Sequence, residues 1–170
     1  CPTKGSIKLR QAVSGYLGRS RNMHVSYERI VIGSGAEHLY GIILQMLGVD
    51  RSYAIEKPSY EKIEQVYNAY GILPEQLPLA KGGIASASLK NSEANVLHVS
   101  PFRSFPSGIT ATVSKRAEYV KWAHKSNRFI IEDDYESEFS VLSKPEDTVF
   151  AMSQDDNVIY INSFSKTISP

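Results

Sequence analysis

Apolar positions recur at two different spacings along this chain. Helical spacing predicts helices at about residues 9–18, 39–47, 63–70 and 114–125. Short runs of consecutive apolar residues predict strands at residues 30–32, 53–55, 96–99, 129–131 and 158–161. Strands and helices therefore alternate, and this alternation predicts an α/β fold with a mainly parallel sheet that helices cover on both faces.

Polar residues and composition refine this picture. The basic residues of the first expected helix should form a solvated face; they are Lys8, Arg10, Arg19 and Arg21. Residues 140–157 have only a weak pattern and are expected to form a connection. The 170 residues, 42% of them hydrophobic, suffice for one core. Because the chain lacks an initiator methionine and stops four residues after Lys166, we expect it to be part of one domain of a longer protein.

Charge and cysteine content narrow the class of partner. Nineteen basic and eighteen acidic residues give a net charge of +1, which is too small to attract nucleic acid or an anionic membrane. The single cysteine, Cys1, cannot form an internal disulfide, and no apolar run approaches the roughly 20 residues that span a bilayer. We therefore expect a cytoplasmic protein that contacts neither DNA nor a membrane through this chain, and we expect no metal site.

The residues best suited to chemistry stand in the last forty positions. Lys166 follows the apolar run at 158–161, and a lysine whose amine is kept neutral by desolvation can form a Schiff base with an aldehyde. Asp133 and Tyr135 follow another expected strand, and residues two apart on an extended segment face the same side. An acid can keep a pyridine nitrogen protonated and a phenol can bond a ring oxygen. The three residues therefore match the needs of pyridoxal phosphate.

A glycine-rich turn, with the sequence Gly-Ser-Gly-Ala-Glu at residues 33–37, joins an expected strand to an expected helix. The backbone amides around Gly35, Ala36 and Glu37 would favour a phosphate at the start of that helix. Ser163 can add a hydroxyl donor to the same phosphate, and Tyr60 can stack on a planar ring. Ligands of open α/β sheets gather at the carboxyl ends of strands, and all these residues fall there.

Taken singly, each of these residues has a plainer interpretation. A lysine near a chain end is usually solvated, a glycine turn is usually only a tight turn, and an isolated tyrosine usually packs against its neighbours. The combination of an amine, an acid, a phenol and a phosphate-binding turn favours a cofactor site over these alternatives.

The order of these motifs resembles the large domain of fold-type I pyridoxal phosphate enzymes, and most specifically the aminotransferase-like half of MocR-type regulators of the GntR superfamily. The matching motifs span nearly the whole chain; they are Gly5 with Leu9-Arg10, residues 33–37, 56–60, 100–101, 105–108, 130–139 and 163–166. The acidic run at 132–139 is the most specific, because free-standing aminotransferases usually place a proline before the tyrosine. The resemblance implies that residues 1–170 are part of a three-layer αβα large domain. A winged-helix DNA-binding domain would precede them and a C-terminal small domain would follow.

The resemblance also implies roles for individual residues. Lys166 would bind pyridoxal 5'-phosphate covalently, Asp133 would pair with the pyridine nitrogen and Tyr135 would bond the ring oxygen. Tyr60 would stack on the ring. The phosphate would be held by Ser163 and by the backbone of Gly35, Ala36 and Glu37. A homodimer with the pocket near the subunit interface is implied as well.

Two positions depart from the family pattern. Glu37 stands where glutamine is common, so only its backbone amide is expected to meet the phosphate. Phe105 stands where typical aminotransferases carry an asparagine that helps to hold the ring oxygen. This loss predicts slow or absent transamination.

The leading hypothesis is a sensor domain of a MocR-type transcriptional regulator. Its cofactor, or the adduct of the cofactor with an amine or amino-acid effector, would change how a linked domain sits on DNA. The alternative is a free-standing aminotransferase that acts on amino acids and 2-oxo acids. A third hypothesis is a cofactor-free domain kept as a dimer scaffold.

Overall fold

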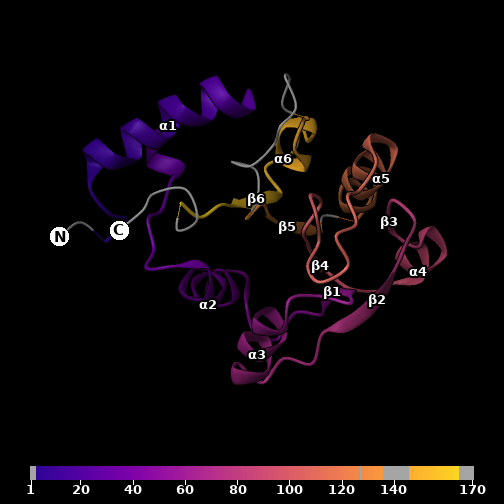
Figure 1. Ribbon diagram of the computed structural model, residues 1–170. Coiled ribbons are helices and arrows are strands. Elements are labelled where there is room, and N and C mark those ends of the chain that lie inside the picture. The colour runs from indigo at the N-terminus through magenta and orange to yellow at the C-terminus, as the bar shows by residue number, and fades with distance from the viewer. Residues whose placement is uncertain (1–2, 127, 136–145, 165–170) are drawn as a thin grey trace.

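The computed structural model describes residues 3–126, 128–135 and 146–164 (Figure 1). The helices are α1 Ile7–Arg21, η1 Tyr27–Arg29 (a 3-10 helix), α2 Ala36–Leu47, α3 Glu61–Ala69, α4 Ser86–Asn91, α5 Val113–His124 and α6 Val149–Met152. The strands are β1 Tyr53–Lys57, β2 Glu75–Ala80, β3 Gly83–Ile84, β4 Val96–Val99, β5 Phe129–Asp133 and β6 Val158–Ile161.

The strands form one six-stranded sheet in the order β3-β2-β1-β4-β5-β6. Neighbouring strands from β2 to β6 run parallel, and only the short β3 is antiparallel to its neighbour. The prediction of an α/β fold with a mainly parallel sheet is confirmed. Because the strands are parallel, their carboxyl ends meet on one side, which we call the carboxyl end of the sheet.

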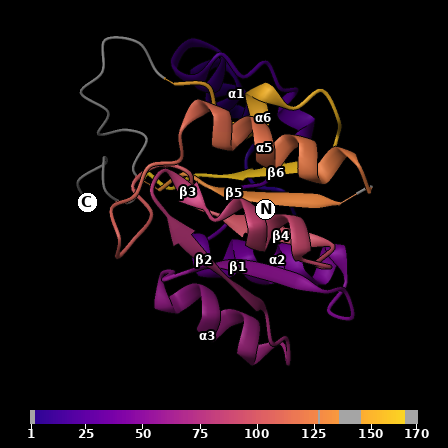
Figure 2. The ribbon, with the colours of Figure 1, turned by 90° about the vertical axis from the view of Figure 1, so that its right-hand side faces the viewer.

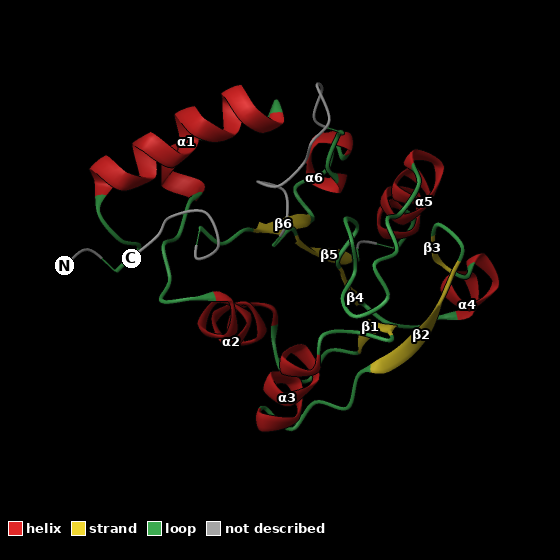
Figure 3. Cartoon of the chain, viewed as in Figure 1, coloured by secondary structure: helices red, strands yellow, loops and turns green. Residues whose placement is uncertain are grey.

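Side chains of the strands β1, β4 and β5 alternate between two cores. Ala54, Leu97 and Ile130 face the core under α4, α5 and α6. Their sequence neighbours Ile55 and Ile131 face the core under α2 and α3. Alternation with a period of two is what a strand imposes. Helices therefore cover both faces of the sheet, as Figures 2 and 3 show.

Helix α1 lies outside these two layers, beyond the β6 side of the sheet (Figures 1 and 2). The expectation that its basic residues are all solvated is wrong for two of them. Arg10 is buried and donates from its side chain to the carbonyl oxygens of Gly5 and Tyr27. Arg21 is also buried and lies near a buried carboxylate described below. Buried arginines of this kind require such partners, because an unpaired charge is costly to desolvate.

The predicted strand at residues 30–32 is wrong. Ile30 follows η1 with extended backbone angles, and the amide of Ile32 donates to the carbonyl of Lys4, 3.0 Å away, rather than to a strand of the sheet. Val31 is 41% exposed, so the apolar run is not the buried centre of a sheet.

The sequence pattern gives little signal for the segment between α3 and β4, which contains β2, β3 and α4. Pro78 lies inside β2, and proline within an apolar run argues against a central strand. Residues 140–145 of the expected connection at 140–157 fall outside the described residues, and the described part, 146–157, contains α6. Among the residues that the structure describes, no helix is long and apolar enough to cross a membrane.

Candidate functional site at the carboxyl end of the sheet

The predicted site residues Tyr60, Asp133 with Tyr135, and Ser163 lie at or after the ends of the parallel strands β1, β5 and β6, and so meet at the carboxyl end of the sheet. The register aligns Asp133 of β5 with Ile161 of β6, and Glu132 with Val99 of β4. The segments after these strands, together with the one after Lys57 of β1, are therefore neighbours. This common position follows from the parallel topology.

Asp133 lies at the centre of a buried polar cluster. The hydroxyl of Tyr40, on α2, donates to its Oδ2 atom, and Nε2 of His98, on β4, lies 3.8 Å from the same oxygen. The Nδ1 atom of His98 is 3.2 Å from the hydroxyl of Tyr67, on α3. His98 Nε2 is buried and forms no hydrogen bond within the described part of the chain. The cluster joins the end of β5 to α2, α3 and β4.

The phenols of this cluster stay neutral. Burial first, and then the neighbouring Asp133 carboxylate, raise the pKa of Tyr40 well above its ordinary value. Burial likewise raises the pKa of Tyr67. Both hydroxyls therefore remain protonated at neutral pH, so Tyr40 donates a hydrogen bond to Asp133 and does not compete with it as an anion.

Asp134 points to the other side of β5. Its Oδ2 accepts a hydrogen bond of 2.7 Å from Tyr160, on β6, and lies 3.6 Å from Nη2 of Arg21. Asp134 is fully buried, so the arginine compensates a carboxylate that water does not reach. Of the two adjacent acids, Asp134 is thus paired with an arginine, whereas Asp133 has a phenol and an imidazole.

Tyr135 and Tyr60 meet the loop after β4. The hydroxyl of Tyr135 donates to the carbonyl oxygen of Arg103 over 2.6 Å. Tyr60 is 42% exposed and contacts Phe105 edge-on, with ring centroids 5.8 Å apart. Asp133 and Tyr135 both lie at the end of β5, but Asp133 contacts α2 and β4, whereas Tyr135 contacts the loop after β4.

Glu56 of β1 anchors the same loop. It is buried and accepts a 2.6 Å hydrogen bond from the hydroxyl of Ser104, next to Phe105. Burial raises the pKa of Glu56 to about 7, although the hydrogen bonds from Ser104 and Ser100 oppose the shift. The loop is thus held by a group that titrates near neutral pH.

The amino end of α2 provides the predicted phosphate position. Gly35 is the residue before the helix, has a φ of 111° and supplies no side chain to cap it. An added Cβ at Gly35 would meet no atom within 4 Å, so the space above the turn is open. Ala36 is partly buried and Glu37 is exposed. Backbone amides in the first turn of a helix attract anions because their donors have no partner within the helix.

The last predicted residues follow β6. Ser163 is partly buried, and its amide is 2.6 Å from the side-chain oxygen of Asn162. Lys166 lies outside the described residues, as does the part of the acidic run at 136–139. The structure therefore brings Asp133, Ser163 and the amino end of α2 to one end of the sheet and leaves the position of the lysine open.

The described residues fit pyridoxal phosphate. Helix α2 presents open amides at its first turn and, one turn later, the Tyr40 hydroxyl that holds Asp133. One rigid element thus relates a position for a phosphate to a buried acid suited to a pyridine nitrogen. No group of three or more histidine, cysteine or acidic side chains within the described ranges is arranged to hold a metal.

Sequence reasoning missed Tyr40, His98, Glu56 and Arg21. Their signals are weak: Tyr40 is one more apolar position of a helical stripe, and Arg21 is one of several basic residues. A histidine within the apolar run at 96–99 was the clearest clue, because such a residue requires a buried partner.

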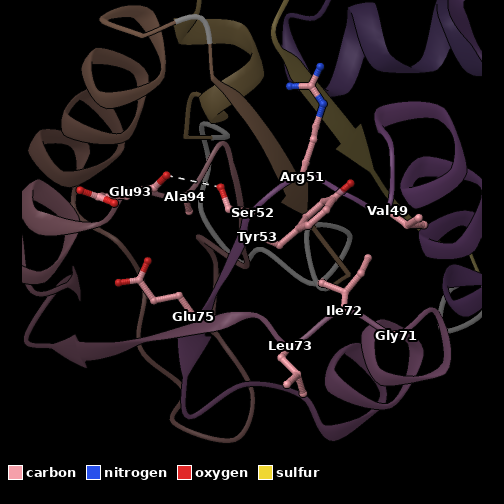
Figure 4. Close-up of a pocket in the computed structure, with 10 residues that line it drawn as sticks. All are labelled: Val49, Arg51, Ser52, Tyr53, Gly71, Ile72, Leu73, Glu75, Glu93 and Ala94. Carbon is pink, nitrogen blue, oxygen red and sulfur yellow. Dashed lines mark hydrogen bonds between the residues drawn. The ribbon is translucent and has the colours of Figure 1, made fainter.

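A separate hollow of about 410 Å³ lies at the opposite, amino end of β1, β2 and β4 (Figure 4). Arg51, Tyr53, Leu73, Glu75 and Glu93 are among its lining residues. None of the predicted site residues lines it. The hollow is therefore unrelated to the candidate site, whose residues follow the other ends of the strands.

Comparisons with known proteins agree with this geometry. The model of the family Aminotransferase class I and II matches residues 1–169. The chain is 31% identical over 166 residues to the uncharacterized HTH-type transcriptional regulator YdeL of Bacillus subtilis, covering 98% of this chain and 36% of that protein. It is 23% identical to the probable rhizopine catabolism regulatory protein MocR of Rhizobium meliloti, covering 98% of this chain and 34% of that protein. The chain thus spans about a third of the length of these relatives.

Solved structures of aminotransferases have the same fold. An archaeal alanine:glyoxylate aminotransferase superposes with a TM-score of 0.89 at 22% identity, covering 98% of this chain and 44% of that one. LysN, the alpha-aminoadipate aminotransferase of Thermus thermophilus, superposes with a TM-score of 0.87 at 23% identity, covering 100% of this chain and 44% of that one.

Proposed function

The chain belongs to the class I and II aminotransferase family, and from this we propose that it is the cofactor-binding, effector-sensing part of a MocR-type transcriptional regulator. The observation that carries the proposal is the double role of α2, which offers open amides at Gly35 and fixes Asp133 through Tyr40. Similarity to YdeL and MocR, which are named as regulators, supports regulation over metabolism.

The cofactor of the proposed site is pyridoxal 5'-phosphate, which when bound supplies an electron sink and an aldehyde that reacts with amines. Lys166 would hold it covalently, and the amides of Gly35, Ala36 and Glu37 with the Ser163 hydroxyl would hold its phosphate. Asp133 would pair with the pyridine nitrogen. Its availability supports this role, because no lysine or arginine of the described residues forms an ion pair with it, whereas Asp134 is paired with Arg21.

The ring would be positioned by two phenols. Tyr135 would bond the ring oxygen and Tyr60, which is partly exposed beside Phe105, would stack on the ring. Glu56 would keep the loop around Phe105 in place through Ser104. These residues bind and orient a planar ligand, and none of them is required to move a proton.

The effector that this domain would sense is an amine or an amino acid. Its reaction with the cofactor would shift the protein between two states if the two states bind the adduct differently. The whole protein would act in the cytoplasm as a homodimer and would bind DNA through a domain outside this chain. With a net charge of +1, the chain itself is expected to bind no DNA at physiological salt.

A free-standing aminotransferase is the second candidate function. The observation that favours it is the close superposition on solved aminotransferases, with a TM-score of 0.89 for the archaeal alanine:glyoxylate enzyme. Phe105 argues against efficient transamination, because it replaces a polar group at the ring oxygen.

The test uses the full-length protein in two assays run side by side. One is a promoter-binding assay with and without amino acids in the presence of pyridoxal phosphate, and the other is a screen for transamination of common amino acids with 2-oxo acids. We expect specific DNA binding that an amino acid alters, with little turnover. A turnover of about 1 s⁻¹ or more, which is ordinary for an enzyme, without specific DNA binding would establish the aminotransferase instead.

A further inference from the structure

Helix α1 contacts the end of β5 through a buried charge. Arg21 is its last residue, and its Nη2 atom lies 3.6 Å from Oδ2 of Asp134. The side chain of Arg21 is 6% exposed and that of Asp134 is 0% exposed. The Tyr160 hydroxyl donates to the same carboxylate oxygen over 2.7 Å. Asp134 is the residue between Asp133 and Tyr135, so this contact meets the backbone of the candidate site from the other side of β5.

A second contact joins α1 to the segment after β6. The ring of Tyr16 packs edge-on against Phe164, with centroids 5.6 Å apart and an interplanar angle of 67°. Phe164 directly follows Ser163 and precedes Lys166 by two positions. Two of the segments that carry predicted cofactor residues, the ones at the ends of β5 and β6, are therefore contacted by the same helix.

Helix α1 has three buried residues, Arg10, Leu17 and Arg21, of which only Leu17 is hydrophobic. None of its residues belongs to either of the two hydrophobic cores in the described part of the chain. Ile7 and Leu9 are 49% and 47% exposed. The position of α1 therefore depends on a few contacts, and two of these lie beside the candidate site.

The two strand ends are also tied to each other. The amide of Asp134 donates to the carbonyl of Ile161 over 2.9 Å. A displacement of the backbone at the end of β5 would therefore displace the backbone at the end of β6. Breaking the contact of Arg21 with Asp134 would leave a buried charge without its partner, which is costly. A movement of the end of β5 is therefore expected to move the ends of β6 and α1 as well. Separating them would break the hydrogen bond of Asp134 to Ile161 or its ion pair with Arg21.

We propose that α1 senses the occupancy of the cofactor site, with Arg21 responding to the end of β5 and Tyr16 to the segment after β6. This inference rests on the proposed function, because it assumes that the cofactor binds at the carboxyl end of the sheet. Occupancy adds contacts to residues 133–135 and 163–164, and through them α1 becomes more firmly held. Since coupling between two sites is reciprocal, loosening α1 lowers the affinity for the cofactor.

Contacts alone do not measure coupling, so the experiment must follow α1 directly. Amide hydrogen exchange of α1 is compared in the full-length protein without cofactor and after loading with pyridoxal phosphate, whose binding is followed by visible absorption. In the wild type we expect slower exchange near the end of α1 after loading. In Arg21→Gln and in Tyr16→Leu we expect loss of this difference, with cofactor still bound at a higher concentration.

Arg19→Gln is the matched control, because Arg19 lies on the same helix and is exposed. It should keep the wild-type difference. If Arg21→Gln does not fold, Tyr16→Leu decides the question, since it changes no buried charge. Equal slowing of exchange in the wild type and in the folded variants would overturn the coupling. Cofactor that binds the wild type without slowing α1 would overturn this inference alone, whereas failure of the wild type to bind cofactor would overturn the proposed function with it.

Discussion

The hydroxyl of Tyr40 on α2 donates a hydrogen bond to the buried carboxylate of Asp133 at the end of β5. This contact fixes the acid relative to the open amino end of α2, where the phosphate is proposed to bind. Because the phenol stays neutral, the negative charge remains on the acid, where a protonated pyridine nitrogen would need it.

Tyr40→Phe should therefore destabilise the protein. The substitution keeps the ring in the core but removes a donor from a buried carboxylate, which costs about 1–3 kcal/mol of the free energy of unfolding. Urea denaturation measures the loss. Tyr70→Phe is the control, because the Tyr70 hydroxyl is near the surface and accepts a bond from Gln45. Equal losses in the two variants would mean that the hydrogen bond to Asp133 stabilises the protein no more than an exposed hydrogen bond does.

Asp133→Asn and Asp134→Asn should have different effects. Loss of the charge at Asp133 is expected to weaken pyridoxal phosphate binding by roughly 2–4 kcal/mol and to shift the visible spectrum, as for other buried charge pairs. Loss of the charge at Asp134 removes the ion pair that Arg21 forms within the described residues and should lower stability more than cofactor affinity. Titration with cofactor and urea denaturation separate the two effects. A larger loss of cofactor affinity at Asp134 would assign the pyridine nitrogen to that acid.

The strands were predictable where a run of consecutive apolar residues marks them in the sequence. The apolar runs at 129–131 and 158–161 are strands, as predicted, and they pair with each other in β5 and β6. The run at 30–32 looks the same in sequence but has no strand beside it. Whether a short apolar run joins a sheet depends on distant segments, and spacing along the chain does not reveal them.

Only part of the candidate site was predictable, because some of its contacts join residues that are far apart in the sequence. Residues that follow strands could be assigned to one end of the sheet, because parallel topology brings those ends together. The hydrogen bond from Tyr40 to Asp133 could not be predicted, because the two residues are 93 positions apart and Tyr40 resembles any other core residue of a helix. The sequence predicts a solvated Arg21, because a helical stripe does not reveal which charges meet a buried acid.

The stability of the protein should depend on pH through Glu56. Burial raises its pKa from 4.5 to about 7, so the folded state favours the protonated form. The contribution of this group to stability is fully present below about pH 4.5 and is lost as the pH rises through about 7. The shift corresponds to at most roughly 3 to 4 kcal/mol. Glu56→Gln, which stays neutral, should flatten this part of the stability profile, whereas Glu61→Gln on the exposed face of α3 should leave it as in the wild type. An unchanged slope in Glu56→Gln would assign the titration to another group.

Gly35→Ala should destabilise the start of α2. The φ of 111° is unfavourable for a residue with a Cβ, and the open space around the turn means that strain in the backbone is the only cost, about 1–3 kcal/mol. Gly15→Ala inside α1 is the matched control with the opposite sign, because alanine is favoured over glycine there by about 0.5–1 kcal/mol. Thermal denaturation compares the two. A stable Gly35→Ala variant would indicate that the turn adopts a different conformation.

Lys166 is expected to carry the cofactor, and the residues around it supply the reason. In the sequence Lys166 comes three residues after Ser163 and five after Ile161, the last residue of β6. Strand β6 ends beside Asp133, and a covalent bond to the aldehyde requires an amine at that end of the sheet. Lys166→Ala should abolish the visible absorption of the protein loaded with pyridoxal phosphate and should leave no adduct after borohydride reduction. Lys62→Ala, on the exposed face of α3, should keep both signals. An adduct that persists in Lys166→Ala would mean that another lysine binds the cofactor, and mapping of the reduced peptide would identify it.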